Sequence, residues 1–340
     1  MTNENLNLTI PNKKIVLSAM KPSGNLHIGN LIGAAKNWLK MQSDYFCYYA
    51  VADLHSITEE IAAKDLREYT LDLFCWFMAM GIDPDKSVLF IQSQVPHHAE
   101  LGWVLNCFTQ FGEARRMTQF KDKSLKNPEN VNLGLFTYPT LMAADILLYG
   151  ANYVPIGKDQ KQHLELARDI AHRFNTRYSP TFATPEGIFP TLGAKIYSLQ
   201  DPSKKMGKSE NDPKGVVMLK DTAADIARKF KSAVTDSETE IKYNLTKKPG
   251  VSNLLVIYAE LLGIDIKTAE KHFADKSYAE LKESVANVVI DALTPLQQKY
   301  NALRADKEKL AQLMKKGADN AAAAARRMLG KVYRKVGFVN

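Results

Sequence analysis

The fold is decided by a short stretch near the start of the chain. Residues 15–19 read IVLSA, and residues 21–30 read KPSGNLHIGN. The first run is apolar with β-branched residues, which predicts a buried strand. The proline and glycine of the second run predict a sharp turn, and the apolar spacing over residues 28–41 predicts a helix. A strand, a tight turn and a helix in this order are typical of an α/β fold.

The same alternation continues through the first half of the chain. We expect strands at residues 14–18, 46–51, 88–92 and 153–156. Helices are expected between them, at residues 28–41, 64–80, 100–111, 141–148 and 160–174. Strands that alternate with helices predict a doubly wound, Rossmann-like parallel sheet.

Two regions depart from this alternation. Residues 96–135 predict a helical insertion with a polar loop at 121–130, where Asn127-Pro128 breaks the helix. After residue 209 only helices are expected, at residues 221–232, 252–263, 266–273, 278–314 and 320–336. We therefore expect an α/β domain over residues 1–210 and an all-helical domain over residues 211–340, with Asp212-Pro213 in the linker.

Composition excludes several other classes of protein. Hydrophobic residues make up 45% of the 340 positions and charged residues 24%, as in an ordinary globular protein with a core. Residues 1–12 are polar, so we expect no signal peptide, and apolar stretches such as residues 71–80 are too short to span a bilayer. Cys47, Cys75 and Cys107 fit neither a zinc site nor a disulfide framework. We expect three buried free thiols in a reducing cytoplasm.

Positive charge gathers at the C-terminal end. The formal net charge is +8, and residues 301–340 hold ten Lys or Arg against three acids, an excess of seven. Such an excess fits a solvated helix face. It fits equally a surface that contacts the phosphates of a nucleic acid.

A candidate phosphate site lies at the first turn. Ser23 and Gly24 let the backbone turn sharply beside a ligand. His27 and Asn30 lie three residues apart at the start of the next helix, where the backbone amides favour anions. A surface histidine after an ordinary turn is the plainer interpretation. The motif KKMGKS at residues 204–209 supplies mobile lysines, and the two motifs together favour a nucleotide triphosphate site.

These two motifs resemble the signature sequences of a known family. HIGN at residues 27–30 and KMGKS at residues 205–209 resemble the signatures of the class I aminoacyl-tRNA synthetases. Four longer stretches resemble the bacterial tryptophanyl-tRNA synthetase family: GEARRMTQFKDK at 112–123, TYPTLMAADILLY at 137–149, GKDQKQH at 157–163 and KSAVTDS at 231–237. The resemblance covers nearly the whole chain after the first dozen residues.

The resemblance implies an activity and its partners. Members of this family activate L-tryptophan with ATP to tryptophanyl-adenylate and pyrophosphate, and then transfer tryptophan to the 3′ end of tRNA(Trp). A homodimer is implied, with a catalytic domain at residues 1–210 and an anticodon-binding domain at residues 211–340. The basic C-terminal helix would serve the tRNA at the anticodon or at the acceptor stem, and would pack back on the catalytic domain. Mg²⁺ would arrive with ATP, because magnesium prefers phosphate oxygens and water, so we expect no metal ligand from the protein and no membrane partner.

The resemblance also assigns roles to single residues. The expected catalytic residues are Lys205 and Lys208 of the loop, together with Lys123, His27 and Asn30. The expected ATP site consists of Lys21, Ser23, Gly24, His27, Gly29, Asn30, Gly157, Asp159, Lys205, Met206, Lys208 and Ser209.

The expected tryptophan pocket is built around Asp145. The indole N–H can only donate a hydrogen bond, and a buried carboxylate can accept it. Met142 lies three residues before Asp145 and would face the same pocket from one helix. Tyr138, His55 and Gln160 match family positions around the ring and the α-amino group. From the residues alone, Met142 could equally be core packing and Asp145 a salt-bridged acid.

Some residues are expected to be ordinary or depart from the family. We expect His97 and His98 to form a surface pair at a helix start, and His163 to be scaffold. Three positions depart from the family pattern, where serine, glutamine and an acid are usual: Gly207, Lys21 and Lys158. The two lysines make the nucleotide site more positive, and the glycine loosens the loop.

Three alternative functions stay open at this point. A tyrosyl-tRNA synthetase would need hydroxyl-binding partners for a phenol and usually carries an extra C-terminal RNA-binding domain. A small-molecule nucleotidylyltransferase would need no long basic helical domain. A non-catalytic paralogue would bind tRNA or tryptophan, but the presence of Lys205, Lys208 and His27 favours an enzyme.

Overall fold

A five-stranded parallel sheet forms the centre of the structure. The computed structural model describes residues 13–189, 194–207 and 212–339, without the side chains of residues 34, 35 and 158. The sheet has the order β3-β2-β1-β4-β5 and all its strand pairs are parallel. The strands are β1 (Ile15–Met20), β2 (Phe46–Val51), β3 (Val88–Ile91), β4 (Tyr153–Pro155) and β5 (Glu186–Ile188). The predicted doubly wound parallel sheet is therefore confirmed.

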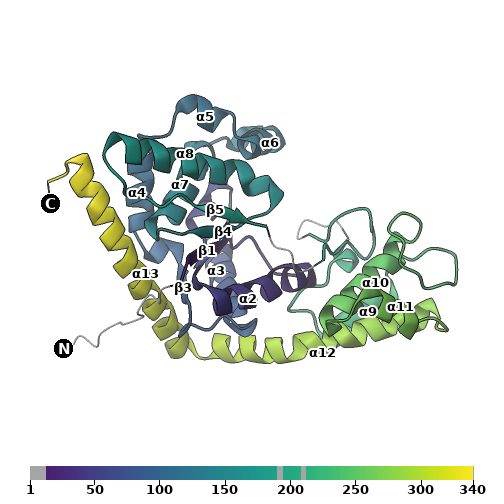
Figure 1. Cartoon of the computed structure of the whole chain (residues 1–340). Coiled ribbons are helices and arrows are strands. Elements are labelled where there is room, and N and C mark those ends of the chain that lie inside the picture. Colours follow the sequence, from purple (N-terminus) through teal and green to yellow (C-terminus); the bar gives the residue numbers. More distant parts are fainter. Residues whose placement is uncertain (1–12, 190–193, 208–211, 340) are drawn as a thin grey trace.

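Alternate residues of the strands enter two separate apolar cores. In the paired register Leu17 lies opposite Tyr48, and both side chains enter one core, while Val16 and Cys47 enter the other. Figure 1 shows the helices that cover the sheet on its two faces. Strand β5 was not predicted, because its three residues hold a glycine and are mostly exposed, so they give no apolar run.

The helices of the first half follow the prediction with shifted ends. Their bounds are α1 (Ile28–Asn30), a π-helical turn (Leu31–Ala35), α2 (Lys36–Asp44), η2, a 3₁₀ helix (Leu54–Thr58), α3 (Ala63–Ala79), α4 (His97–Asn106), α5 (Phe111–Arg115), α6 (Thr118–Lys126), α7 (Leu133–Leu148) and α8 (Lys161–Arg177). The expected polar loop at residues 121–130 is wrong over its first half, which belongs to α6. Asn127-Pro128 ends that helix as predicted. Helix α7 begins earlier than expected, because the Asn132 side chain caps it by accepting a hydrogen bond from the Leu135 amide at 2.9 Å.

The second half of the chain is helical. Its helices are α9 (Ala223–Lys231), α10 (Pro249–Leu262), α11 (Ile266–His272), α12 (Tyr278–Ala305) and α13 (Lys307–Val336). The expected break between residues 314 and 320 is wrong, since the chain breaks at Asp306 instead. There the Asp306 side chain caps α13 by accepting from the Lys309 amide at 2.9 Å.

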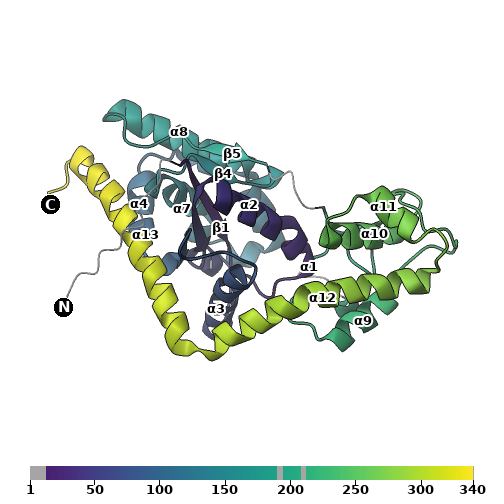
Figure 2. The ribbon, with the colours of Figure 1, turned by 60° about the horizontal axis from the view of Figure 1, so that its bottom comes forward.

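Gly317 lies in the middle of α13, within the break that the sequence predicts between residues 314 and 320. A Cβ atom at Gly317 would lie 1.8 Å from the carbonyl oxygen of Leu89 in β3, so only glycine fits. The glycine therefore allows α13 to pack closely on the edge strand of the sheet. Figures 1 and 2 show α12 leading from the α9–α11 group to the α/β body, along which α13 then runs.

A buried acid links α12 to α3. Asp72 on α3 forms an ion pair with Lys220 and accepts a hydrogen bond from the Tyr300 hydroxyl. The Tyr300 ring stacks on Trp76, with ring centroids 4.4 Å apart. One apolar core accordingly continues from α3 into α10 and α12.

The cysteines are only partly as expected. Cys47 and Cys75 are buried free thiols, and burial raises the pKa of each to about 11. The prediction is wrong for Cys107, which is exposed at the C-terminal end of α4. Among the described residues, no single helix is long and apolar enough to cross a bilayer, while the bent pair α10–α11 passes by length and composition alone.

Candidate active site

A cavity of about 430 Å³ opens at the carboxyl ends of β1 and β4. The strand order reverses at this point, because β2 and β3 lie on one side of β1 whereas β4 and β5 lie on the other. Open α/β sheets bind their ligands at such a reversal. The cavity is lined by residues after β1, by one face of α7 and by the loop that follows β4. Eight residues of the predicted sites line it: Lys21, His55, Lys123, Tyr138, Met142, Asp145, Gly157 and Gln160.

Asp145 is the best-connected polar group of this cavity. Its Oδ1 accepts hydrogen bonds from Gln92 Nε2 at 2.7 Å and from His98 Nδ1 at 2.6 Å. Its Oδ2 lies 2.8 Å from His55 Nε2. Burial alone would raise the pKa of Asp145, but the bonds from His55 and His98 outweigh it and lower the pKa to about 2. Asp145 is therefore an ionised acceptor at neutral pH.

His98 is a site residue that sequence reasoning missed. The expected surface pair is wrong for His98, whose side chain is buried and joins Asp145 to the Tyr149 hydroxyl, 2.7 Å from Nε2. The signal was present in the spacing. His98 lies three residues before Leu101 and seven before Leu105 on the same helix, both fully buried, so it falls on the buried face of that helix.

A second polar chain crosses the cavity wall and includes His163. The Tyr138 hydroxyl lies 2.9 Å from His163 Nε2, and Nδ1 of the same ring lies 2.8 Å from Gln160 Oε1. Gln160 in turn donates to Asp159 at 2.8 Å. Burial lowers the pKa of His163 to about 4, so a neutral ring donates to Gln160 and accepts from Tyr138. His163, expected to be scaffold, thus orients two residues of the predicted tryptophan site.

Cations gather at the mouth of the cavity. Lys21 Nζ and Lys123 Nζ lie 3.0 Å and 2.8 Å from the same oxygen of Glu59. Lys123 also lies over the Tyr138 ring, 5.5 Å from its centroid. Lys21, one of the departures from the family pattern, therefore points into the same space as Lys123.

The first signature motif contacts the segments on either side of the second. The amide of Ile28 donates to the carbonyl of Val217 at 3.0 Å, and the amide of Leu219 donates to Leu26 at 2.8 Å. Lys205 of the lysine loop forms an isolated antiparallel bridge with Tyr197, and a Cβ on Gly29 would lie 3.6 Å from Ile196. The start of the first motif thus lies against residues 217–219, which follow the second motif, and beside Ile196, which precedes it.

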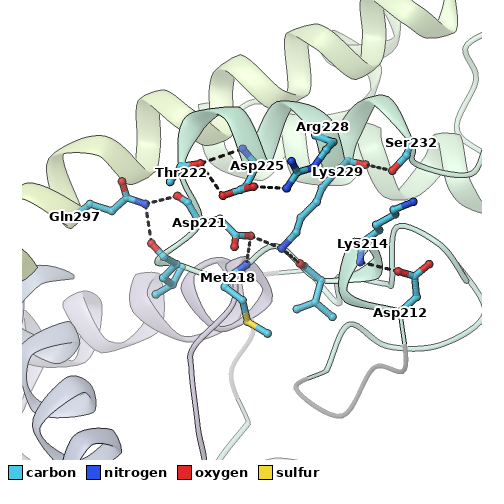
Figure 3. A network of polar contacts seen from close by, with 12 residues as sticks. Asp212, Lys214, Met218, Asp221, Thr222, Asp225, Arg228, Lys229, Ser232 and Gln297 are labelled. Carbon is cyan, nitrogen blue, oxygen red and sulfur yellow. Dashed lines mark hydrogen bonds and ion pairs between the residues drawn. The ribbon is translucent and has the colours of Figure 1, made fainter.

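Side chains of α9 and α12 hold residues 216–221 in place. Figure 3 shows Asp221 accepting from the Met218 amide at 2.8 Å and from Lys229 at 2.6 Å. Lys229 also donates to the carbonyl of Val216, and Gln297 of α12 donates to those of Leu219 and Asp221. Residues 216–221 are therefore fixed to α9 and α12.

Several predicted nucleotide residues are not among those that line the cavity, namely Ser23, Gly24, His27, Gly29, Asn30 and Asp159. Gly24 has φ 106°, which suits the sharp turn expected with Ser23. The Asn30 side chain accepts from the His27 amide at 3.0 Å and so caps its own helix. Asp159 is exposed, with its carboxylate on Gln160.

The lysine loop is described as far as Gly207. The Met206 side chain is buried in the core, so it anchors the loop and only its backbone can face a ligand, while Lys205 is exposed. A Cβ on Gly207 would lie 3.7 Å from the Lys205 carbonyl oxygen, its nearest neighbour among the described residues, which is ordinary van der Waals contact. Lys208, Ser209 and the side chain of Lys158 lie outside the described residues.

Comparisons with known proteins identify the family of this chain. The model of the family "tRNA synthetases class I (W and Y)" matches residues 11–294. A tryptophan–tRNA ligase of Clostridium acetobutylicum is 49% identical over 96% of this chain and 98% of its own length. The crystal structure of tryptophanyl-tRNA synthetase from Mycoplasma pneumoniae has a TM-score of 0.84 at 34% identity, covering 96% of this chain and 98% of that one. The Campylobacter jejuni enzyme, complexed with ADP and tryptophan, has a TM-score of 0.84 at 32% identity, covering 95% and 100%. A family match over most of the chain, together with a relative at 49% identity, shows that this chain belongs to the class I tRNA synthetases of the tryptophan and tyrosine group.

Proposed function

We propose that the protein is a tryptophan–tRNA ligase. It activates L-tryptophan with ATP to tryptophanyl-adenylate and pyrophosphate, and transfers tryptophan to the 3′ end of tRNA(Trp). The observation that carries the proposal is the buried, ionised Asp145 in a cavity whose mouth holds Lys21 and Lys123. The relatives named above as tryptophan–tRNA ligases support it.

Asp145 has an acceptor position to offer an indole. A carboxylate accepts about four hydrogen bonds. Donors among the described residues take three of these positions, two on Oδ1 and one on Oδ2. The remaining position on Oδ2 suits the indole N–H, while Met142 packs on the ring. Phenylalanine would leave this acceptor unpaired, and such a mismatch is worth roughly 10⁴–10⁵ in discrimination.

In the activation step the protein positions the tryptophan carboxylate near the α-phosphorus and supplies positive charge to the phosphates. The carboxylate of tryptophan is already ionised near pH 7, so it attacks the α-phosphorus without a general base. Lys21, Lys123 and Lys205 then offset the charge on the phosphates, with Lys208 of the same loop. His27 and the helix that starts beside it contribute to the nucleotide site. Mg²⁺ enters as the ATP complex, bound chiefly by phosphate oxygens and water.

The partners of the proposal are tRNA(Trp) and a second copy of the chain. The helical half, residues 211–340, binds the anticodon, and the basic residues of α13 contact tRNA phosphates. Four large apolar side chains on α4, α5, α6 and α7 are 70–81% exposed. Exposed apolar side chains of this size, when they gather on one surface, are typical of a protein–protein contact. The four are Trp103, Phe111, Leu125 and Leu133, and they form the homodimer contact in this proposal. The protein acts in the cytoplasm, where tRNA is charged.

Amino-acid-dependent exchange of pyrophosphate into ATP tests the proposal. Each of the twenty amino acids is supplied in turn, and tryptophan alone should drive exchange. Exchange with tyrosine as the best substrate, or with none of the twenty, would reject the proposal. Charging of a tRNA(Trp) transcript then tests the second step.

A further inference from the structure

Glu59 lies between two cations that the nucleotide needs. Its Oε1 is 3.0 Å from Lys21 Nζ and 2.8 Å from Lys123 Nζ. Lys21 follows β1, Lys123 belongs to α6, and Glu59 directly follows η2. One oxygen therefore joins three separate elements at the mouth of the cavity.

This arrangement is the one a phosphate oxygen would adopt between two lysines. The lysine side chains are only 26% and 34% exposed, so water screens their mutual repulsion incompletely. Burial lowers the pKa of Lys21, and the neighbouring charge of Lys123 acts in the same direction, against the bonds from Glu59. Burial would raise the pKa of Glu59, but both lysines outweigh it and lower the pKa. The two ammonium groups thus require an anion between them, and Glu59 supplies it.

We propose that Glu59 takes the place of a phosphate in the nucleotide-free enzyme, and that ATP displaces it from Lys21 and Lys123. The inference rests on the proposed function, since it takes the triphosphate to be the incoming anion. Glu59 keeps the two lysines together and oriented toward the cavity until ATP binds. The same contact weakens ATP binding, because the lysines must exchange one anion for another.

The surroundings of Glu59 allow it to leave. Its side chain is 53% exposed, and ion pairs of this exposure are individually weak. A second hollow beside the first is lined by Glu59 and Glu60 together with Lys123, Lys126 and Asn130. Rotation of the carboxylate into this hollow brings it into water near another lysine. The side chain therefore has open space into which ATP can displace it.

Glu59→Gln is the direct test, with Glu60→Gln as its matched control. Both variants remove one negative charge from neighbouring exposed positions, but Glu60 has no ion pair among the described residues. Binding of Mg²⁺–ATP is measured by calorimetry without tryptophan, and the KM for ATP by pyrophosphate exchange. We expect Glu59→Gln to bind ATP about three- to tenfold more tightly, because two weak ion pairs no longer compete. Glu60→Gln should stay within about twofold of the unchanged protein, as a general field effect allows.

Two outcomes overturn the inference. ATP affinity that is equal in Glu59→Gln and Glu60→Gln means that Glu59 does not compete with phosphate. Weaker ATP binding in Glu59→Gln means that Glu59 remains as a support for the lysines in the complex. As a second test, the gain from Glu59→Gln should shrink in a Lys21→Gln background, and a gain that persists in full also overturns it. Failure of tryptophan-dependent exchange in the unchanged protein rejects the proposed function instead, so the two failures are distinguishable.

Discussion

Replacing Asp145 with asparagine separates recognition of the indole from general damage to the site. Asparagine keeps the shape but turns one acceptor oxygen into a donor and removes the charge. The lost bond joins an N–H to an ionised, buried oxygen, and such bonds contribute about 1.5–3 kcal/mol. At about 1.4 kcal/mol per factor of ten, kcat/KM for tryptophan should fall about 10- to 150-fold.

The assay compares tryptophan with β-(benzothien-3-yl)alanine, whose ring has sulfur in place of the N–H. The analogue has no hydrogen bond to lose, so Asp145→Asn should change its kcat/KM less than about threefold. The KM for ATP and the melting temperature of the variant serve as controls for local unfolding. Equal losses for both amino acids would refute the reasoning, because they would show that Asp145 supports the cavity without contacting the indole nitrogen.

Further outcomes follow from the same structure. Gly317→Ala should destabilise the fold by about 3 kcal/mol, since its Cβ would meet the Leu89 carbonyl at 1.8 Å, whereas Gly330→Ala on the same helix has room and should be neutral or stabilising in a urea titration. Burial lowers the pKa of His163 to about 4 in the folded protein, whereas the unfolded value is about 6.5. Between these two pH values the unfolded chain binds one proton more than the folded protein, so the free energy of unfolding falls as the pH decreases through this range. His163→Gln should flatten this dependence in denaturant titrations at several pH values; an unchanged slope would contradict the assignment of a neutral buried ring. Trp103→Glu should give a monomer by light scattering if the exposed apolar side chains of α4–α7 form the dimer contact, while Tyr178→Glu, at a partly exposed position on the C-terminal end of α8, should leave the oligomeric state unchanged.

The sequence predicts the sheet well where a strand is a buried apolar run. Strand β2 was placed at its observed bounds because all six of its residues are buried. Strand β5 gave no such signal, since it is a three-residue edge strand that is mostly exposed and pairs with β4. In α13, glycine at position 317 has the local appearance of a helix end, and only the approach of Leu89 gives it another meaning.

The candidate site shows the same limit. Motifs brought Asp145, Tyr138 and Gln160 to attention, and the structure places all three at one cavity. The spacing around His98 indicates burial on a helix face, but it does not indicate a role in the site, because the partners of His98 and of His163 in the cavity wall lie on other elements. Glu59 was missed for a related reason, as its pairing with Lys21 and Lys123 exists only in three dimensions.

A crystal structure of the protein with bound tryptophan tests the central claim most directly. We predict the indole nitrogen within about 3 Å of Asp145 Oδ2, with the ring in the cavity and the amino acid's carboxylate directed toward Lys21 and Lys123. An indole whose nitrogen faces another group, or a tryptophan bound outside this cavity, would contradict the account.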